Sequence, residues 1–204
     1  MSSELSIDLE KRFRVVGAAL SAFSRFGYKR TSMADIAAAA GMSRPSLYLV
    51  FANKAAVFRA LAEMLLGDAM TGAEAAWPEG MDVAEGLTAA ILAKDLPIHQ
   101  LLAATPHAGE ILAEAEVLAG DLHKDSAARF AALVVARFTA AGVVDAEDVA
   151  RLVVNAADGL KHAKLDEAIY VADVTRLAGL VAGQAGLVVG PLASIVVAAT
   201  QARP

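Results

Sequence analysis

The chain has 204 residues, of which 57% are apolar and 20% charged, and its formal net charge is −5. It contains no cysteine, which excludes disulfides and thiolate metal sites and suits a reducing compartment. The length permits one or two domains, and abundant alanine without alternating β-branched residues predicts an all-α fold.

The hydrophobic spacing predicts helices in chain order at 8–26, 33–40, 44–50, 54–72, 82–94, 107–119, 124–141, 146–164 and 167–184. Pro97, Pro106 and Gly142 separate neighbouring helices. We expect Thr105 to precede a helix with Pro106 in its first position, and Asp145 to cap another. The N-terminal segment lacks the apolar core of a signal peptide, so we expect a cytoplasmic protein.

Residues 31–51, TSMADIAAAAGMSRPSLYLVF, contain the most informative pattern in the chain. Ser32 and Asp35 are spaced as a capping box, which predicts a helix start. Gly41 would end that helix in a left-handed conformation, and Ser43 would cap the next one, with Pro45 in its first turn. Two short helices joined in this way are typical of a helix-turn-helix that enters a nucleic-acid groove.

The charge distribution favours the same interpretation. Residues 1–66 hold nine Lys or Arg against five Asp or Glu, a net charge of +4, whereas the remaining 138 residues have a net charge of −9. The basic excess therefore lies on the segment with the motif, as binding to a polyanion requires. We predict that double-stranded DNA is the partner.

Positions 13–66 resemble the DNA-binding domain of the TetR (tetracycline-repressor-like) family. The resemblance is carried by GMSRPSLY, by a Phe two residues before an Asn-Lys cap, and by a Phe-Gly-Tyr helix end. It implies an N-terminal three-helix helix-turn-helix domain over residues 1–53. It also implies a C-terminal helical domain for effector binding and dimerisation over residues 54–204.

The resemblance also implies DNA-binding roles for individual residues. Thr31, Ser32, Tyr48 and Lys54 match phosphate-contacting positions, while the exposed start of the second motif helix matches positions that read base edges. The full predicted set is Thr31, Ser32, Ser43, Arg44, Pro45, Ser46, Tyr48 and Lys54. Each has a structural alternative: Ser32 and Ser43 could serve only as caps, and Tyr48 could bury its ring. Val50 stands where the family often has Tyr or His, so one backbone contact is expected to be missing.

The family resemblance further implies a ligand-responsive repressor that binds a near-palindromic operator as a homodimer through its last two long helices. The effector is an unknown small molecule, and the expected pocket residues are Met64, Trp77, His107, Phe130 and Phe138. Met and aromatic residues at helical spacing are more often ordinary core.

We expect no cofactor and no metal. His107, Glu110 and Glu114 fall on one helical face, but a second close histidine is lacking. No nucleophile elbow, phosphate loop or HExxH motif occurs, so we expect no enzymatic activity.

Residues 177–202 offer the main alternative, because they carry no formal charge over 26 residues. A membrane helix must therefore be considered. Gly190-Pro191 and several other glycines divide the run into pieces too short to span, and small residues also allow close packing of two helices. We favour a dimer interface and no membrane, and keep a membrane-tethered or architectural DNA-binding protein as the alternative.

Overall fold

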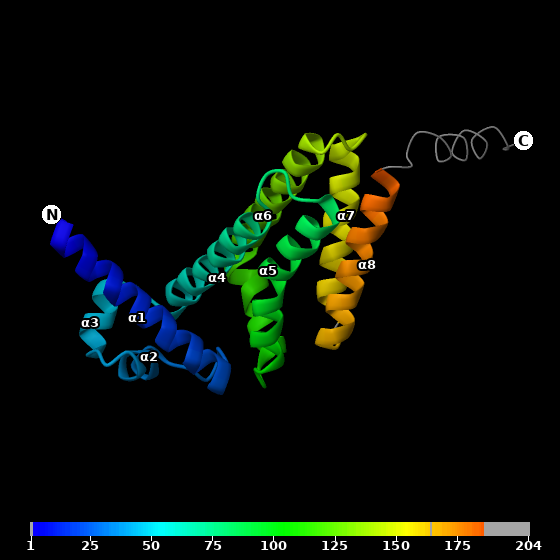
Figure 1. Cartoon of the computed structure of the whole chain (residues 1–204). Coiled ribbons are helices and arrows are strands. Elements are labelled where there is room, and N and C mark those ends of the chain that lie inside the picture. Colours follow the sequence, from blue (N-terminus) through cyan, green and yellow to red (C-terminus); the bar gives the residue numbers. More distant parts are fainter. Residues whose placement is uncertain (1, 164, 186–204) are drawn as a thin grey trace, which may run out of the picture. The chain divides into compact units, whose positions relative to one another are not determined.

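The computed structural model describes residues 2–163 and 165–185 (Figure 1). Within these ranges the chain forms eight helices and no strand, which confirms the predicted all-α fold. The helices are α1 (Ser2–Phe26), α2 (Met33–Ala39), α3 (Arg44–Val50), α4 (Lys54–Ala76), α5 (Val83–Ala103), α6 (Ala108–Ala140), α7 (Ala146–His162) and α8 (Glu167–Ala185). Among the described residues, no helix has the length and apolar character needed to cross a membrane.

The contacts divide the chain into two compact units, each with its own apolar core. The first unit comprises Met1–Ala69 and Pro97–Ser126, and the second comprises Met70–Leu96 and the chain from Ala127 onward. Helices α4, α5 and α6 therefore each contribute one part to each unit.

The core of the first unit is built on three aromatic rings. The rings of Phe23 and Phe58 lie 5.7 Å apart between centroids, and Tyr28 lies 5.4 and 5.2 Å from them in tilted and edge-on arrangements. Ile36 and Leu47, from α2 and α3, are fully buried in the same cluster. The two short helices are thus fixed by the apolar side chains they bury against α1 and α4.

The core of the second unit surrounds Trp77, which is 1% exposed and packs edge-on against Phe138 at 6.1 Å. A Cβ atom at Gly86 would overlap the indole ring, so α5 passes Trp77 at a distance that only glycine permits. Phe130 and Tyr170 complete the buried aromatic set. Arg137 lies beside this core and donates from Nε to the Trp77 carbonyl at 2.9 Å.

A buried charge lies beside this core. The Asp95 side chain is 2% exposed and accepts from the Lys94 ammonium at 2.6 Å, with the Lys161 ammonium 3.5 Å away. Burial lowers the pKa of Lys94, and the adjacent Asp95 opposes that shift. Burial and the nearby Asp95 charge raise the pKa of Tyr170, whose hydroxyl lies 3.5 Å from the carboxylate. These contacts connect α5, α7 and α8 through polar atoms that burial would otherwise penalise.

Two expected helix boundaries differ in the structure. The helices expected at 107–119 and 124–141 are one helix, α6, with a kink at Ala119 where φ is −142° and ψ is 17°. Pro97 was expected to separate helices but lies inside α5. Because proline lacks an N–H, it cannot bond the Ala93 carbonyl. That carbonyl faces Gly72, where a Cβ atom would lie 3.4 Å from it.

Two expected helix starts are also wrong in detail. Helix α6 begins at Ala108, after a turn in which the Thr105 carbonyl accepts from the Ala108 amide at 3.2 Å. Asp145 precedes α7 in a left-handed conformation with φ of 53°, and its side chain makes no capping hydrogen bond. Of the uncharged C-terminal run, the structure describes only the part within α8. Residues 186–202, including Gly190 and Pro191, lie outside the described residues.

Candidate nucleic-acid interface

Helix α2 begins with the capping box that the sequence predicts. The Ser32 hydroxyl accepts from the Asp35 amide at 3.2 Å, and the Asp35 carboxylate accepts from the Ser32 amide at 2.8 Å. The Ser32 hydroxyl also donates to this carboxylate, and these bonds lower the pKa of Asp35. The cap satisfies amides that the first turn of a helix otherwise leaves without acceptors.

The turn between α2 and α3 also follows the prediction. Gly41 has a φ of 64°, the left-handed conformation that favours glycine, and the Met42 amide donates to the Ala37 carbonyl at 2.9 Å. The Ser43 hydroxyl accepts from the Ser46 amide at 3.2 Å, and Pro45 lies in the first turn of α3. Capping by Ser32 and Ser43 is therefore confirmed, whereas their DNA contacts stay predictions.

Helix α3 has one buried and one exposed face. Leu47 is fully buried, and Phe51 at the end of the helix is 4% exposed, so these side chains anchor α3 to the first unit. Arg44, Pro45 and Tyr48 are exposed, and the Arg44 guanidinium lies 5.7 Å from the centroid of the Tyr48 ring. The exposed face thus presents a cation and an aromatic ring side by side, with Ser46 half-buried beside them.

Thr31 and Lys54, both expected at phosphate-contacting positions, face inward in the structure. Thr31 is 2% exposed, and its hydroxyl donates to the Gly27 carbonyl at 2.7 Å. The Lys54 ammonium donates to the carbonyls of Tyr28 and Thr31 at 2.7 and 2.9 Å and lies 4.2 Å from the Tyr28 ring centroid. Both residues therefore stabilise the turn that leads from α1 into α2. Their contacts with DNA remain untested predictions.

That turn is also held by α6. The Lys29 amide donates to the Glu110 carboxylate at 2.5 Å. Gly27 adopts a φ of 81°, and a Cβ atom at this position would lie 2.7 Å from the same carboxylate. Glu110 was considered above as a metal ligand beside His107. In the part of the chain that the structure describes, no three His, Asp or Glu side chains gather at a metal-binding distance.

Arg12 belongs to the basic residues that are expected to give a general electrostatic attraction and not to read specific bases. Its guanidinium lies 4.7 Å from the centroid of the Phe51 ring, which places a cation at the C-terminal end of α3. The side chain is exposed, as are those of Arg25, Lys29 and Arg30. The sequence signal for Arg12 is only its membership of the basic N-terminal segment, because α1 and α3 are brought together by tertiary packing.

The comparisons with known proteins agree with this geometry. Residues 15–61 match the family model described as "Bacterial regulatory proteins, tetR family". This segment of the chain is a TetR-family DNA-binding domain. No curated protein matches the chain. TetR-family regulators are non-enzymatic DNA-binding proteins, which agrees with the expectation of no enzymatic activity.

The similarity to solved structures extends over most of the chain and not only over the helix-turn-helix segment. GusR of Salmonella enterica is 26% identical, with a TM-score of 0.66 over 86% of this chain and 95% of GusR. A transcriptional regulator from Cytophaga hutchinsonii is 18% identical, with a TM-score of 0.66 over 83% of this chain and 95% of its own. The fatty acid degradation regulator FadR from Bacillus halodurans is 20% identical, with a TM-score of 0.59 over 84% of this chain and 94% of FadR. These likenesses confirm the predicted arrangement of a helix-turn-helix followed by a helical domain.

The residues expected to line an effector pocket are spread over both units. Met64 is partly buried in the first unit, while Trp77, Phe130 and Phe138 belong to the core of the second. The carbonyl of His107 accepts from the Ile111 amide at 3.0 Å at the start of α6. None of these five residues lines the apolar cavity of the first unit, and their role in effector binding stays a prediction.

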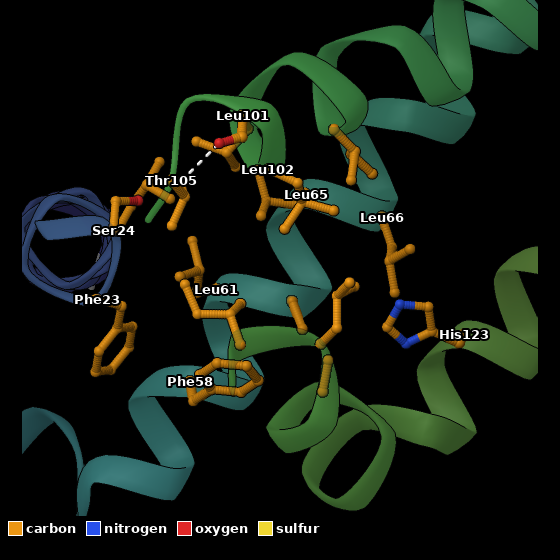
Figure 2. Close-up of a pocket in the computed structure, with 16 residues that line it drawn as sticks. Phe23, Ser24, Phe58, Leu61, Leu65, Leu66, Leu101, Leu102, Thr105 and His123 are labelled. Atoms are coloured by element: carbon orange, nitrogen blue, oxygen red, sulfur yellow. Dashed lines mark hydrogen bonds between the residues drawn. The ribbon is translucent and has the colours of Figure 1, made fainter. Parts of the chain in front are cut away.

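The first unit contains an apolar cavity of about 90 Å³. Figure 2 shows that α1, α4, α5 and α6 all contribute side chains to it. Its polar side chains are Ser24, Thr105 and His123, and none of the described Asp, Glu, Lys or Arg residues lines it. The apolar lining comprises Leu20, Phe23, Phe58, Leu61, Ala62, Leu65, Leu66, Ile98, Leu101, Leu102, Ile111, Leu112 and Ala115. Sequence periodicity cannot reveal this cavity, because apolar positions that line a cavity have the same spacing as those that fill a core.

Proposed function

We propose that this regulator is a ligand-responsive repressor, located in the cytoplasm, that binds a near-palindromic operator as a homodimer. In this proposal residues 1–53 form the DNA-binding domain, and residues 54–204 bind the effector and hold the dimer together. The exposed start of α3 carries the proposal, because it presents Arg44 beside Tyr48 on a helix whose other face is anchored by Leu47. An exposed Arg in this position has the geometry for bidentate contact with guanine in the major groove.

The proposed contacts divide into two kinds. Arg44, Pro45 and Ser46 read base edges, while Ser32, Ser43 and Tyr48 contact the sugar–phosphate backbone and set the orientation of α3. Exposed cations in the same unit add attraction that does not depend on sequence; they are Arg12, Arg25, Lys29 and Arg30. Lys54 and Thr31 act mainly by holding the turn before α2, and any phosphate contact of Lys54 is additional.

Dimerisation through α7 and α8 is supported by the side chains these helices leave uncovered. Leu152 on α7 is 61% exposed, and Ile169 and Leu180 on α8 are 51% and 62% exposed. A Cβ atom at Gly159 or Gly179 would meet no atom of the described residues within 4 Å. Packing within one chain does not require glycine at these positions, so the small residues favour close approach of a second chain. In a symmetric dimer each such contact occurs twice.

Two recognition helices related by a dyad read more sequence than one. A dimer of helix-turn-helix domains places its two reading helices about 34–36 Å apart, one turn of the double helix. This spacing is why the operator is expected to be near-palindromic. A ligand would regulate the complex by binding the DNA-bound and DNA-free states with unequal affinity.

Selection of bound fragments from random duplex DNA tests this function. We expect an enriched near-palindrome, one dimer per fragment, and loss of high affinity when one half-site is scrambled. Enrichment of a single unpaired half-site would contradict the dimeric mode. Equal retention of all sequences would instead indicate an architectural DNA-binding protein, since backbone contacts alone carry no sequence information.

A further inference from the structure

The cavity in the first unit touches the DNA-binding segment itself. Leu20, Phe23 and Ser24 of α1 line it, as do Phe58 and Leu61 of α4. Figure 2 labels Phe23, Ser24, Phe58 and Leu61 among the lining side chains. The other walls come from the end of α5 with its following turn and from the first half of α6. A molecule in this cavity would therefore contact α1 and α4 directly, without transmission through other residues.

The size and lining of the cavity limit the class of ligand. An apolar protein cavity of about 150 Å³ accepts benzene, whereas this one has about 90 Å³, so a narrow chain fits it more readily than a ring. Because the described lining includes no Asp, Glu, Lys or Arg, burying a charged group inside the cavity would be unfavourable. Leu112, which is 49% exposed, and the exposed His123 lie at the rim, so a chain can extend toward solvent.

The polar groups suggest where one end of the ligand lies. Thr105 already donates its hydroxyl to the Leu101 carbonyl at 2.7 Å (Figure 2). Nδ1 of His123 lies 3.1 Å from the Ala119 carbonyl, which leaves Nε2 as the ring nitrogen that can meet a ligand. We propose that the cavity binds a linear alkyl ligand, with its chain between α1 and α4 and a single polar end group at His123.

A ligand bound in this cavity would act directly on the elements that position α2 and α3. The Phe23 carbonyl accepts from the Gly27 amide at 2.9 Å, and the Phe23 ring contacts Tyr28 and Phe58. An alkyl chain that displaces Phe23 would disturb the turn whose carbonyls hold Lys54. This regulatory consequence rests on the proposed function, whereas binding of the ligand does not.

Binding is tested with the full-length protein and the series of linear alcohols from 1-butanol to 1-dodecanol, measured by calorimetry without DNA. Each buried methylene should tighten binding about fourfold until the cavity is full, after which the affinity levels off. Ala115→Phe fills the cavity from α6 and should weaken binding at least about tenfold. Ala113→Phe adds the same ring at an exposed site of α6 and should leave the affinity within about twofold.

A second variant tests the proposal independently if Ala115→Phe fails to fold. Leu101→Ala enlarges the cavity and should move the levelling point to alcohols about two to three carbons longer. Absence of binding across the series, or equal weakening by Ala113→Phe and Ala115→Phe, overturns the proposal.

A separate measurement of operator affinity by fluorescence anisotropy distinguishes the two hypotheses. We expect saturating alcohol to weaken DNA binding by the wild type and Ala113→Phe but not by Ala115→Phe. A protein that binds DNA but no alcohol refutes only the cavity ligand. A protein that binds alcohol but no DNA refutes only the proposed function.

Discussion

Arg59 on α4 and Asp121 on α6 form an ion pair in which both terminal guanidinium nitrogens donate to the carboxylate. Nη1 donates to Oδ1 at 2.7 Å and also to the Leu118 carbonyl at 3.1 Å, while Nη2 donates to Oδ2. A bidentate arrangement is more directional than a single contact, although both side chains remain partly exposed to solvent. The pair thus joins two helices of the first unit close to the apolar cavity.

The first prediction concerns the pH dependence of this pair. The hydrogen bond from Arg59, followed by its charge, lowers the pKa of Asp121 from 3.8 to about 2. A carboxyl whose pKa is lower in the folded state stabilises the protein above its unfolded pKa, and this contribution is lost as the pH falls through the folded value. Asp121→Asn should therefore reduce the change in unfolding free energy between pH 4 and pH 2, measured by urea denaturation.

The matched control for this measurement is Asp68→Asn, at an exposed carboxylate on the same helix as Arg59. It should leave the pH dependence close to that of the wild type. The same pH profile for both variants would contradict a specific stabilising role for Asp121.

The second prediction separates structure from DNA contact at Lys54. Lys54→Met removes an ammonium that donates to two main-chain carbonyls, so the free energy of unfolding should fall by about 2 kcal/mol. Lys29→Met is the control at an exposed lysine and should change stability by less than about 0.5 kcal/mol. Unchanged stability of Lys54→Met together with weaker DNA binding would show that Lys54 acts on phosphate alone.

The third prediction concerns base reading by Arg44. Arg44→Ala should weaken binding to the selected operator by roughly 1–3 kcal/mol and relax the base preference at one position of each half-site. Lys29→Met should instead weaken binding to all sequences and reduce the slope of affinity against salt by about one. Titrations at three salt concentrations against operator and scrambled duplexes distinguish the two effects. A uniform loss for Arg44→Ala would assign it to the phosphate backbone.

The fourth prediction concerns the close approach of α5 to Trp77. Gly86→Ala places a methyl group against the indole ring and should destabilise the fold by about 1–3 kcal/mol. Gly17→Ala, at a helical glycine whose added Cβ meets none of the described atoms within 4 Å, should instead stabilise the protein by up to about 1 kcal/mol. Trp77 is the only tryptophan, so its fluorescence reports unfolding and local rearrangement. Equal stability of the two variants would mean that the second unit accommodates the methyl group.

The fifth prediction concerns the proposed dimer. Leu180→Arg places a charge on the exposed face of α8 and should convert the dimer to a monomer at micromolar concentration, as measured by sedimentation equilibrium. Val117→Arg changes a residue that is 78% exposed on α6 and should leave the dimer intact. A wild-type protein that is monomeric at millimolar concentration would rule out the interface.

The sequence was informative where structure is local. Capping by Ser32 and Ser43 and the left-handed Gly41 depend on residues within a few positions of one another, so spacing alone predicted them. The inward position of Lys54 was missed because its carbonyl partners lie 23 and 26 residues earlier. The cavity was missed for the same reason, since its walls come from four helices that only tertiary packing brings together.

The contact between Glu110 and position 29 has a consequence for the surface charge. The Glu110 carboxylate accepts from the Lys29 main-chain amide and not from its ammonium. Helix α6 is thus attached to the turn without neutralising the positive charge of Lys29. An acidic helix can therefore hold the turn while the lysine side chain remains available to a polyanion. Because every residue except proline offers the same amide, the side chain at position 29 can vary with the DNA target while this attachment is kept.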